Sequence, residues 1–218
     1  MQFIFHLFFN IIIMGGVIMR VLCFGDSNTW GYTPLTGLRN PNRWTKVLET
    51  LVENIEVIEE GLNARTLCTL DPSEPHKNGF NYLLPCLESH YEFDYLVLML
   101  GTNDLKTHFH NSAKDMLEMI KKYIKVVKNF WPKTDGSKVK LIICGIPPVD
   151  DTKYVFENYE GTTKKRNEFN MLEYKYCAER DITFIDNSDL EVGKDGIHLT
   201  EESHFKLALK IASIIKGE

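Results

Sequence analysis

Five short apolar runs, rich in β-branched and aromatic side chains, recur along the chain, and most of them are apolar without interruption. They span residues 20–24, 55–58, 95–100, 139–144 and 182–185. A strand with one face in water alternates apolar and polar residues, whereas a strand of a parallel sheet is covered on both faces and is continuously apolar. The five runs therefore predict a buried parallel sheet.

Stretches with apolar residues at helical spacing separate these runs. The clearest are 43–51, 112–130 and the stretch that begins at Thr200. Ser112 and Thr200 are residue types that cap helix N-termini. Strands that alternate with helices are joined by crossovers that cover both faces of the sheet. We therefore expect an α/β fold with three layers, α/β/α, whose functional loops follow the carboxyl ends of the strands.

Composition excludes several classes of partner and site. The chain has 218 residues, enough for one full-sized core, and its formal net charge of −5 gives no reason to expect a nucleic acid partner. Its five cysteines include no C-x-x-C pair and predict neither a disulfide framework nor a zinc site. His108 and His110 lack a nearby carboxylate or cysteine that would complete a metal site, so we expect no metal.

The first nineteen residues are almost wholly apolar and contain no Lys, Arg, Asp or Glu. Their length is near that of a membrane span. However, no basic segment precedes them, no small-residue cleavage site ends them, and the first strand follows at once from Arg20. Met19 can itself serve as the initiator. We therefore divide the chain into an extension, 1–19, and one domain, 20–218, and expect a cytoplasmic protein. Export or membrane anchoring through residues 1–19 is the alternative.

Two of the strand-like runs are followed by residues suited to nucleophilic catalysis. Ser27 follows the first run, and His198 follows the last, three residues after Asp195. A serine hydroxyl becomes a good nucleophile when a base takes its proton, and a carboxylate can orient that base. In the alternative interpretation, Ser27 and Asp26 cap a helix and His198 lies in a surface turn.

Donors for an oxyanion follow the second and third strand-like runs. Asn103 follows Gly101, whose backbone freedom can direct the Asn103 amide, and Ala64 can offer a backbone N–H. With the N–H of Ser27 these groups make a three-donor oxyanion hole. In the alternative, Asn103 is a loop residue and Asp104 caps a helix.

Four blocks stand in this order in the chain: GDSNTWGY, EEGLNARTL, LGTND and DGIHLT. Together they resemble the SGNH (GDSL-type) hydrolase family, most closely its arylesterase and acyltransferase branch. Shorter matches to that branch are Asn42-Arg43-Trp44, Asp71-Pro72, Asn78-Gly79 and Tyr82-Leu83. The resemblance extends from Arg20 to the C-terminus.

The resemblance implies a flavodoxin-like sheet of five parallel strands and an esterase without a cofactor. It implies that Ser27 is the nucleophile in a triad with Asp195 and His198, and that Ala64 and Asn103 donate to the oxyanion. Trp30 and Tyr32 are expected to line the substrate site, with core packing as the alternative. Residues 1–18 have no counterpart in the family pattern, and the loop 31–43 is shorter than in the acyltransferase members.

We therefore expect a serine esterase that hydrolyses or transfers small acyl groups of carboxylic esters through an acyl-enzyme on Ser27. Its partner is a small-molecule ester. A carbohydrate or cell-wall O-deacetylase, a lysophospholipase or a thioesterase of the same fold are alternatives, and a catalytically silent binding module is another. The sequence leaves open whether the protein forms a homo-oligomer.

Overall fold

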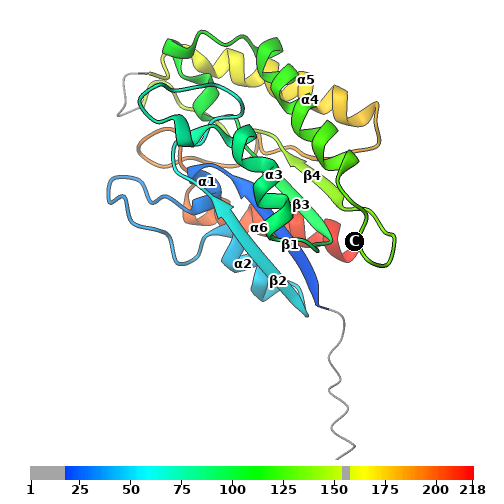
Figure 1. Ribbon diagram of the computed structural model, residues 1–218. Coiled ribbons are helices and arrows are strands. Elements are labelled where there is room, and N and C mark those ends of the chain that lie inside the picture. Colours follow the sequence, from blue (N-terminus) through cyan, green and yellow to red (C-terminus); the bar gives the residue numbers. More distant parts are fainter. Residues whose placement is uncertain (1–17, 154–157) are drawn as a thin grey trace, which may run out of the picture.

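A sheet of parallel strands forms the middle layer of the molecule (Figure 1). The computed structural model describes residues 18–153 and 158–218, so most of the apolar extension expected at 1–19 lies outside the described residues. The strands are β1 (Met19–Gly25), β2 (Ile55–Gly61), β3 (Tyr95–Met99), β4 (Lys140–Cys144) and β5 (Thr183–Ile185). Their spatial order, β2-β1-β3-β4-β5, is that of a flavodoxin-like fold. The predicted five-stranded parallel sheet is confirmed.

Alternate side chains of each central strand enter two separate cores. In β1, Val21 and Cys23 face one core, and Leu22 and Phe24 face the other. The first core is covered by α2 (Trp44–Leu51) and α6 (Glu201–Lys216). The second is covered by α3 (Gly79–Ser89), α4 (Ala113–Asn129) and α5 (Thr162–Ala178) (Figure 1). The predicted three layers are confirmed, and continuous burial on both faces explains the apolar runs.

The two predicted caps are present. The Ser112 hydroxyl accepts from the Asp115 N–H at 3.2 Å in a reciprocal capping box, and the Thr200 hydroxyl accepts from the Ser203 N–H at 3.2 Å. Each cap satisfies an N–H group that has no partner within its helix. In α6 the apolar pattern is only partly buried, since Leu207 packs in the core whereas Phe205 is 48% exposed.

Two helices, α3 and α5, were not predicted from the sequence. In α5 the buried face includes Arg166, Asn170 and Glu173, so apolar periodicity cannot reveal it. In α3 the helix begins at a glycine and contains Pro85.

No helix within the described ranges combines the length and the apolar character needed to cross a membrane.

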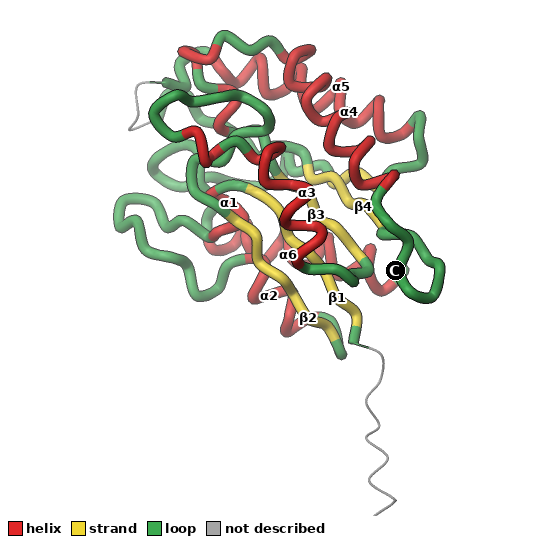
Figure 2. Tube along the Cα trace, viewed as in Figure 1, coloured by secondary structure: helices red, strands yellow, loops and turns green. Residues whose placement is uncertain are grey.

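The loops that follow the strands gather at one edge of the sheet (Figure 2). Gly25, at the end of β1, is paired with both Gly61 of β2 and Met99 of β3. The three segments that follow these strands therefore leave the sheet side by side. They carry Ser27, Ala64 and Asn103.

Candidate active site

The turn after β1 places Ser27 at the start of α1 (Ser27–Trp30). Asp26 caps this short helix by accepting from the Asn28 N–H at 2.9 Å, so the capping expected of Asp26 in the alternative interpretation is present next to Ser27. Ser27 is 7% exposed. Among the described residues, no protein acceptor takes its backbone N–H. The serine thus presents both a hydroxyl and an unpaired donor.

His198 connects Ser27 to Asp195. Its Nε2 lies 2.8 Å from the Ser27 Oγ, and its Nδ1 lies 2.7 Å from Asp195 Oδ2. Burial acts to raise the pKa of Asp195, but hydrogen bonds from the His198 ring and from the backbone N–H groups of Ile197 and His198 outweigh it and hold the pKa below its usual range. An ionised carboxylate only accepts hydrogen bonds. Nδ1 therefore carries the proton, and Nε2 is free to accept from Ser27.

Two further donors lie beside Ser27. Ala64 adopts a left-handed conformation with φ of 63°, and its N–H takes no acceptor in the described part of the chain. The Asn103 Nδ2 donates to the Arg65 carbonyl at 3.0 Å, which occupies one of its two hydrogens. Gly101 has a φ of 127°, a backbone conformation for which the freedom of glycine is needed, as expected. A Cβ at this position would lie 3.0 Å from Ile146 Cδ1.

This constellation of serine, histidine, aspartate and unpaired donors coincides with a family match. Residues 23–204 match the model of the GDSL-like lipase/acylhydrolase family. The chain belongs to this family. No curated protein matches it.

Solved structures agree with this assignment. The aryl esterase of M. smegmatis is 31% identical, with a TM-score of 0.84 over 91% of this chain and 99% of that one. Est24, a carbohydrate acetylesterase from Sinorhizobium meliloti, is also 31% identical, with a TM-score of 0.82 over the same shares, 91% and 99%. The chain is therefore a carboxylic ester hydrolase of the GDSL-like family, as the sequence blocks predicted.

In this GDSL-like hydrolase, Asn28 holds the segment that carries His198. Its Nδ2 donates to the Ile197 carbonyl at 3.1 Å, and its Oδ1 accepts from the Leu199 N–H at 2.9 Å. Asn28 was not among the residues expected to serve the site. Its position next to Ser27 was the only signal in the sequence, and it does not reveal a partner so distant in the chain.

Asp104 does not cap a helix, and that alternative was wrong. Its buried carboxylate accepts from the Leu67 N–H at 2.7 Å and from the Thr69 hydroxyl at 2.5 Å. Burial raises the pKa of Asp104 to about 7 even though both hydrogen bonds favour the charged form. The side chain joins the segment after β3 to the segment after β2, and these segments carry Asn103 and Ala64.

The two aromatic residues expected at the substrate site differ in their contact with His198. The Tyr32 ring packs on the His198 imidazole, with centroids 4.3 Å apart and planes inclined by 32°. Trp30 lies beyond Tyr32, at a centroid distance of 6.5 Å, and the Arg39 guanidinium covers its ring at 5.4 Å. Tyr32 is therefore in contact with His198, whereas Trp30 packs against Tyr32 and Arg39.

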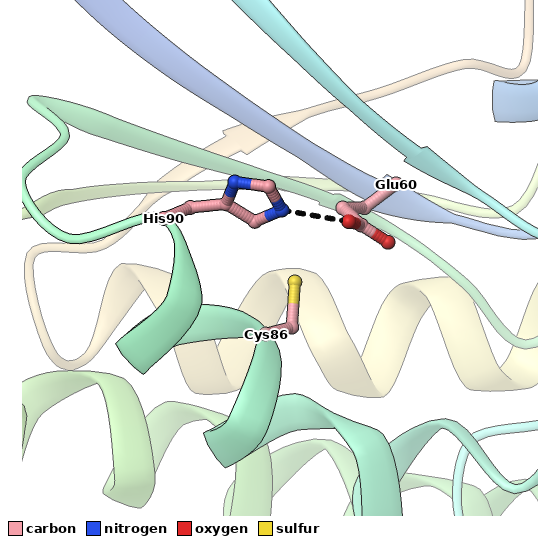
Figure 3. A group of neighbouring side chains, drawn as sticks. All are labelled: Glu60, Cys86 and His90. Atoms are coloured by element: carbon pink, nitrogen blue, oxygen red, sulfur yellow. Dashed lines mark hydrogen bonds and ion pairs between the residues drawn. The ribbon is translucent and has the colours of Figure 1, made fainter.

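A group of potential metal ligands lies away from this site (Figure 3). His90 Nε2 is 2.8 Å from Glu60 Oε1, and the Cys86 sulfur points toward the pair (Figure 3). The Arg65 guanidinium donates to the Glu60 carbonyl, so a positive charge already lies beside the group. Burial, with the Glu60 charge, raises the pKa of the Cys86 thiol to about 12. The adjacent Arg65 charge opposes a bound cation, and we interpret the group as a histidine–carboxylate pair over a packed thiol.

Proposed function

We propose that the protein is a serine esterase that removes short acyl groups from carboxylic esters through an acyl-enzyme on Ser27. The observation that carries this proposal is the unbroken chain of contacts from Asp195 through His198 to the Ser27 Oγ, at 2.7 and 2.8 Å. These distances lie within the range for proton transfer.

In the first step, His198 Nε2 takes the Ser27 proton while Oγ attacks the ester carbonyl carbon. The carbonyl oxygen becomes an oxyanion and accepts from the N–H groups of Ser27 and Ala64 and from the Asn103 amide. The intermediate then collapses, the bond to the alcohol oxygen breaks, and His198 gives its proton to the leaving alcohol. Asp195 stabilises the imidazolium that exists between these events.

In the second step, water or another alcohol attacks the acyl-enzyme carbonyl and loses its proton to His198. Collapse of this second intermediate returns the proton to the Ser27 Oγ and releases the acid or a new ester. The same residues thus serve hydrolysis and acyl transfer, and the acceptor decides the product.

A preference for short acyl groups is supported by the contact of Tyr32 with His198, which places an aromatic wall at the base itself. Of the two similar proteins, an aryl esterase and a carbohydrate acetylesterase, the second acts on acetyl esters and supports the same size range. Because of the second of these, removal of acetyl groups from a carbohydrate is our second candidate.

Hydrolysis of p-nitrophenyl esters from acetate to decanoate tests the first candidate. We expect activity to fall beyond short chains and to be lost in Ser27→Ala. The matched control is Ser188→Ala, whose hydroxyl lies on the surface next to Asp186 and should leave activity unchanged. Activity in Ser27→Ala would refute the mechanism, and equal rates on decanoate and acetate would favour the lysophospholipase or thioesterase alternative.

Acetate release from an acetylated oligosaccharide tests the second candidate. A kcat/KM higher than that for p-nitrophenyl acetate would support carbohydrate deacetylation. Little release from the saccharide, with good turnover of the aryl ester, would exclude it. Adding an alcohol acceptor to the same assay and measuring the new ester gives the share of acyl transfer.

A further inference from the structure

The side-chain amide of Asn103 is held at both ends. Its Oδ1 lies 3.3 Å from the hydroxyl of Tyr159, and its Nδ2 donates to the Arg65 carbonyl at 3.0 Å. A carbonyl oxygen only accepts, so the Arg65 carbonyl requires the nitrogen of the amide on its side. The amide oxygen must then face Tyr159, and the phenol hydroxyl donates to it.

Tyr159 is well placed to keep this contact. It is 2% exposed and belongs to the core beneath α4 and α5. Burial raises the pKa of its hydroxyl far above the usual range, and the neighbouring charges of Asp26, Asp104 and Asp195 raise it further. The hydroxyl therefore keeps its proton at neutral pH and can donate it to the Asn103 amide oxygen.

A donor on the amide oxygen affects the amide nitrogen in two ways. It prevents rotation of the amide, so the second Nδ2 hydrogen points in one direction only. It also draws electron density from the nitrogen. Consecutive hydrogen bonds polarise one another, and each becomes stronger by roughly 10–30%. Both effects strengthen the hydrogen bond that the second Nδ2 hydrogen, which the Arg65 carbonyl leaves unpaired, can donate. This hydrogen bond stabilises an oxyanion more than it stabilises a neutral ester carbonyl.

We propose that Tyr159 is a positioning residue for the oxyanion hole, which acts on the reaction through Asn103 and without contact to the substrate. This inference rests on the proposed function, because it gives Asn103 the role of an oxyanion donor. It assigns a role to a residue that lies outside every sequence block considered above. It also predicts that the contribution of Tyr159 depends on Asn103.

A double-mutant cycle tests this dependence. Removing a hydrogen bond worth roughly 1 kcal/mol lowers the rate about fivefold. We expect Tyr159→Phe to lower kcat by about that factor with KM within about twofold, because the donor acts in the transition state. In the Asn103→Ala background the same change should have almost no effect, since the amide through which Tyr159 acts is gone.

The control variant is Tyr95→Phe. Its hydroxyl accepts from Lys140 Nζ at 3.2 Å at the start of β3, the end of the strand opposite to Asn103, and its loss should leave kcat unchanged. A second variant replaces Tyr159 by 3-fluorotyrosine, which keeps the hydroxyl and makes it a stronger donor. We expect this protein to retain or exceed the wild-type kcat. It preserves the test if Tyr159→Phe folds poorly.

An equal loss of kcat in both backgrounds would overturn the proposal, because Tyr159 would then act independently of Asn103. An unchanged kcat in Tyr159→Phe, or a fall with 3-fluorotyrosine, would also overturn it. These failures are distinct from failure of the proposed function. If Ser27→Ala is inactive but the cycle shows no coupling, only the role of Tyr159 is refuted, whereas an active Ser27→Ala refutes the acyl-enzyme itself.

Discussion

The side-chain oxygen of Asn28 accepts a hydrogen bond from the Leu199 N–H at 2.9 Å, although the two residues lie 171 positions apart. Asn28 also holds the Ile197 carbonyl, so it grips the peptide groups on both sides of His198. The residue next to Ser27 therefore fixes the backbone on both sides of His198. Because of these contacts, the fold itself sets the distance between Ser27 and His198, whether or not a substrate is bound.

Replacing Asn28 by Ala should therefore impair both stability and rate. Two buried backbone groups lose their partner, at a cost of about 1–3 kcal/mol for each, and a displaced imidazole lowers kcat by roughly 10- to 100-fold. Urea unfolding and ester hydrolysis measure the two effects. Asn42→Ala, which removes an exposed hydrogen bond to Glu201, is the control and should change neither. A wild-type kcat in Asn28→Ala would contradict the role of Asn28 in positioning His198.

Asp195→Asn should fold normally and lose most of its activity. The amide cannot hold the proton on Nδ1 and stabilise an imidazolium as a carboxylate does, and a loss of about 10⁴-fold in kcat is typical for such a change. The loss in Ser27→Ala should be at least as large. Asp186→Asn, on the surface, is the matched control. Retention of more than about a tenth of kcat in Asp195→Asn would remove Asp195 from the triad.

Gly101→Ala should be destabilising for two reasons. A left-handed φ costs a non-glycine residue about 1–3 kcal/mol, and the new Cβ crowds Ile146. Gly136→Ala shares the positive φ, 81°, but meets no atom within 4 Å. Urea unfolding of the pair separates the two contributions, and only Gly101→Ala should also lower kcat, because it displaces the loop of Asn103. Equal stability of the two variants would show that Ile146 yields without cost.

Acid should destabilise the protein through His204. Burial lowers the pKa of His204 to about 4, the neighbouring His198 ring and Arg43 act in the same direction, and the His204 Nδ1 accepts from the Trp44 N–H at 3.3 Å. Because the folded pKa lies below the unfolded value of about 6.5, the contribution is fully present above that value and is lost as the pH falls toward 4. Between pH 7 and 5 the loss is about 2 kcal/mol.

The measurement for His204 is the free energy of unfolding in urea at pH 7 and pH 5, compared with His204→Asn. The asparagine oxygen can still accept from Trp44 but cannot titrate, so the difference between the two proteins isolates His204 from Asp104 and other groups common to both. We expect the wild type to lose more stability than the variant. Equal losses would show that His204 is already neutral in both states or charged in both.

Much of the fold could be predicted because its signals are local. The apolar runs marked all five strands to within a few residues, and the caps at Ser112 and Thr200 marked two helix starts. The helices α3 and α5 were missed, since buried polar residues such as Glu173 interrupt the apolar pattern of α5. Periodicity reports burial only where the buried side chains are apolar.

The sequence by itself determined which residue types are available: a serine, a histidine, a carboxylate and an amide, each in a segment that follows a strand. Only the tertiary structure decided how they are oriented. Asn28 reaches Leu199, Asp104 reaches Leu67 and Tyr159 reaches Asn103 because the parallel pairing of all five strands brings the segments that follow them together. Side-chain hydrogen bonds between distant segments leave no periodic trace in a sequence, since their partners are set by strand pairing and not by spacing along the chain.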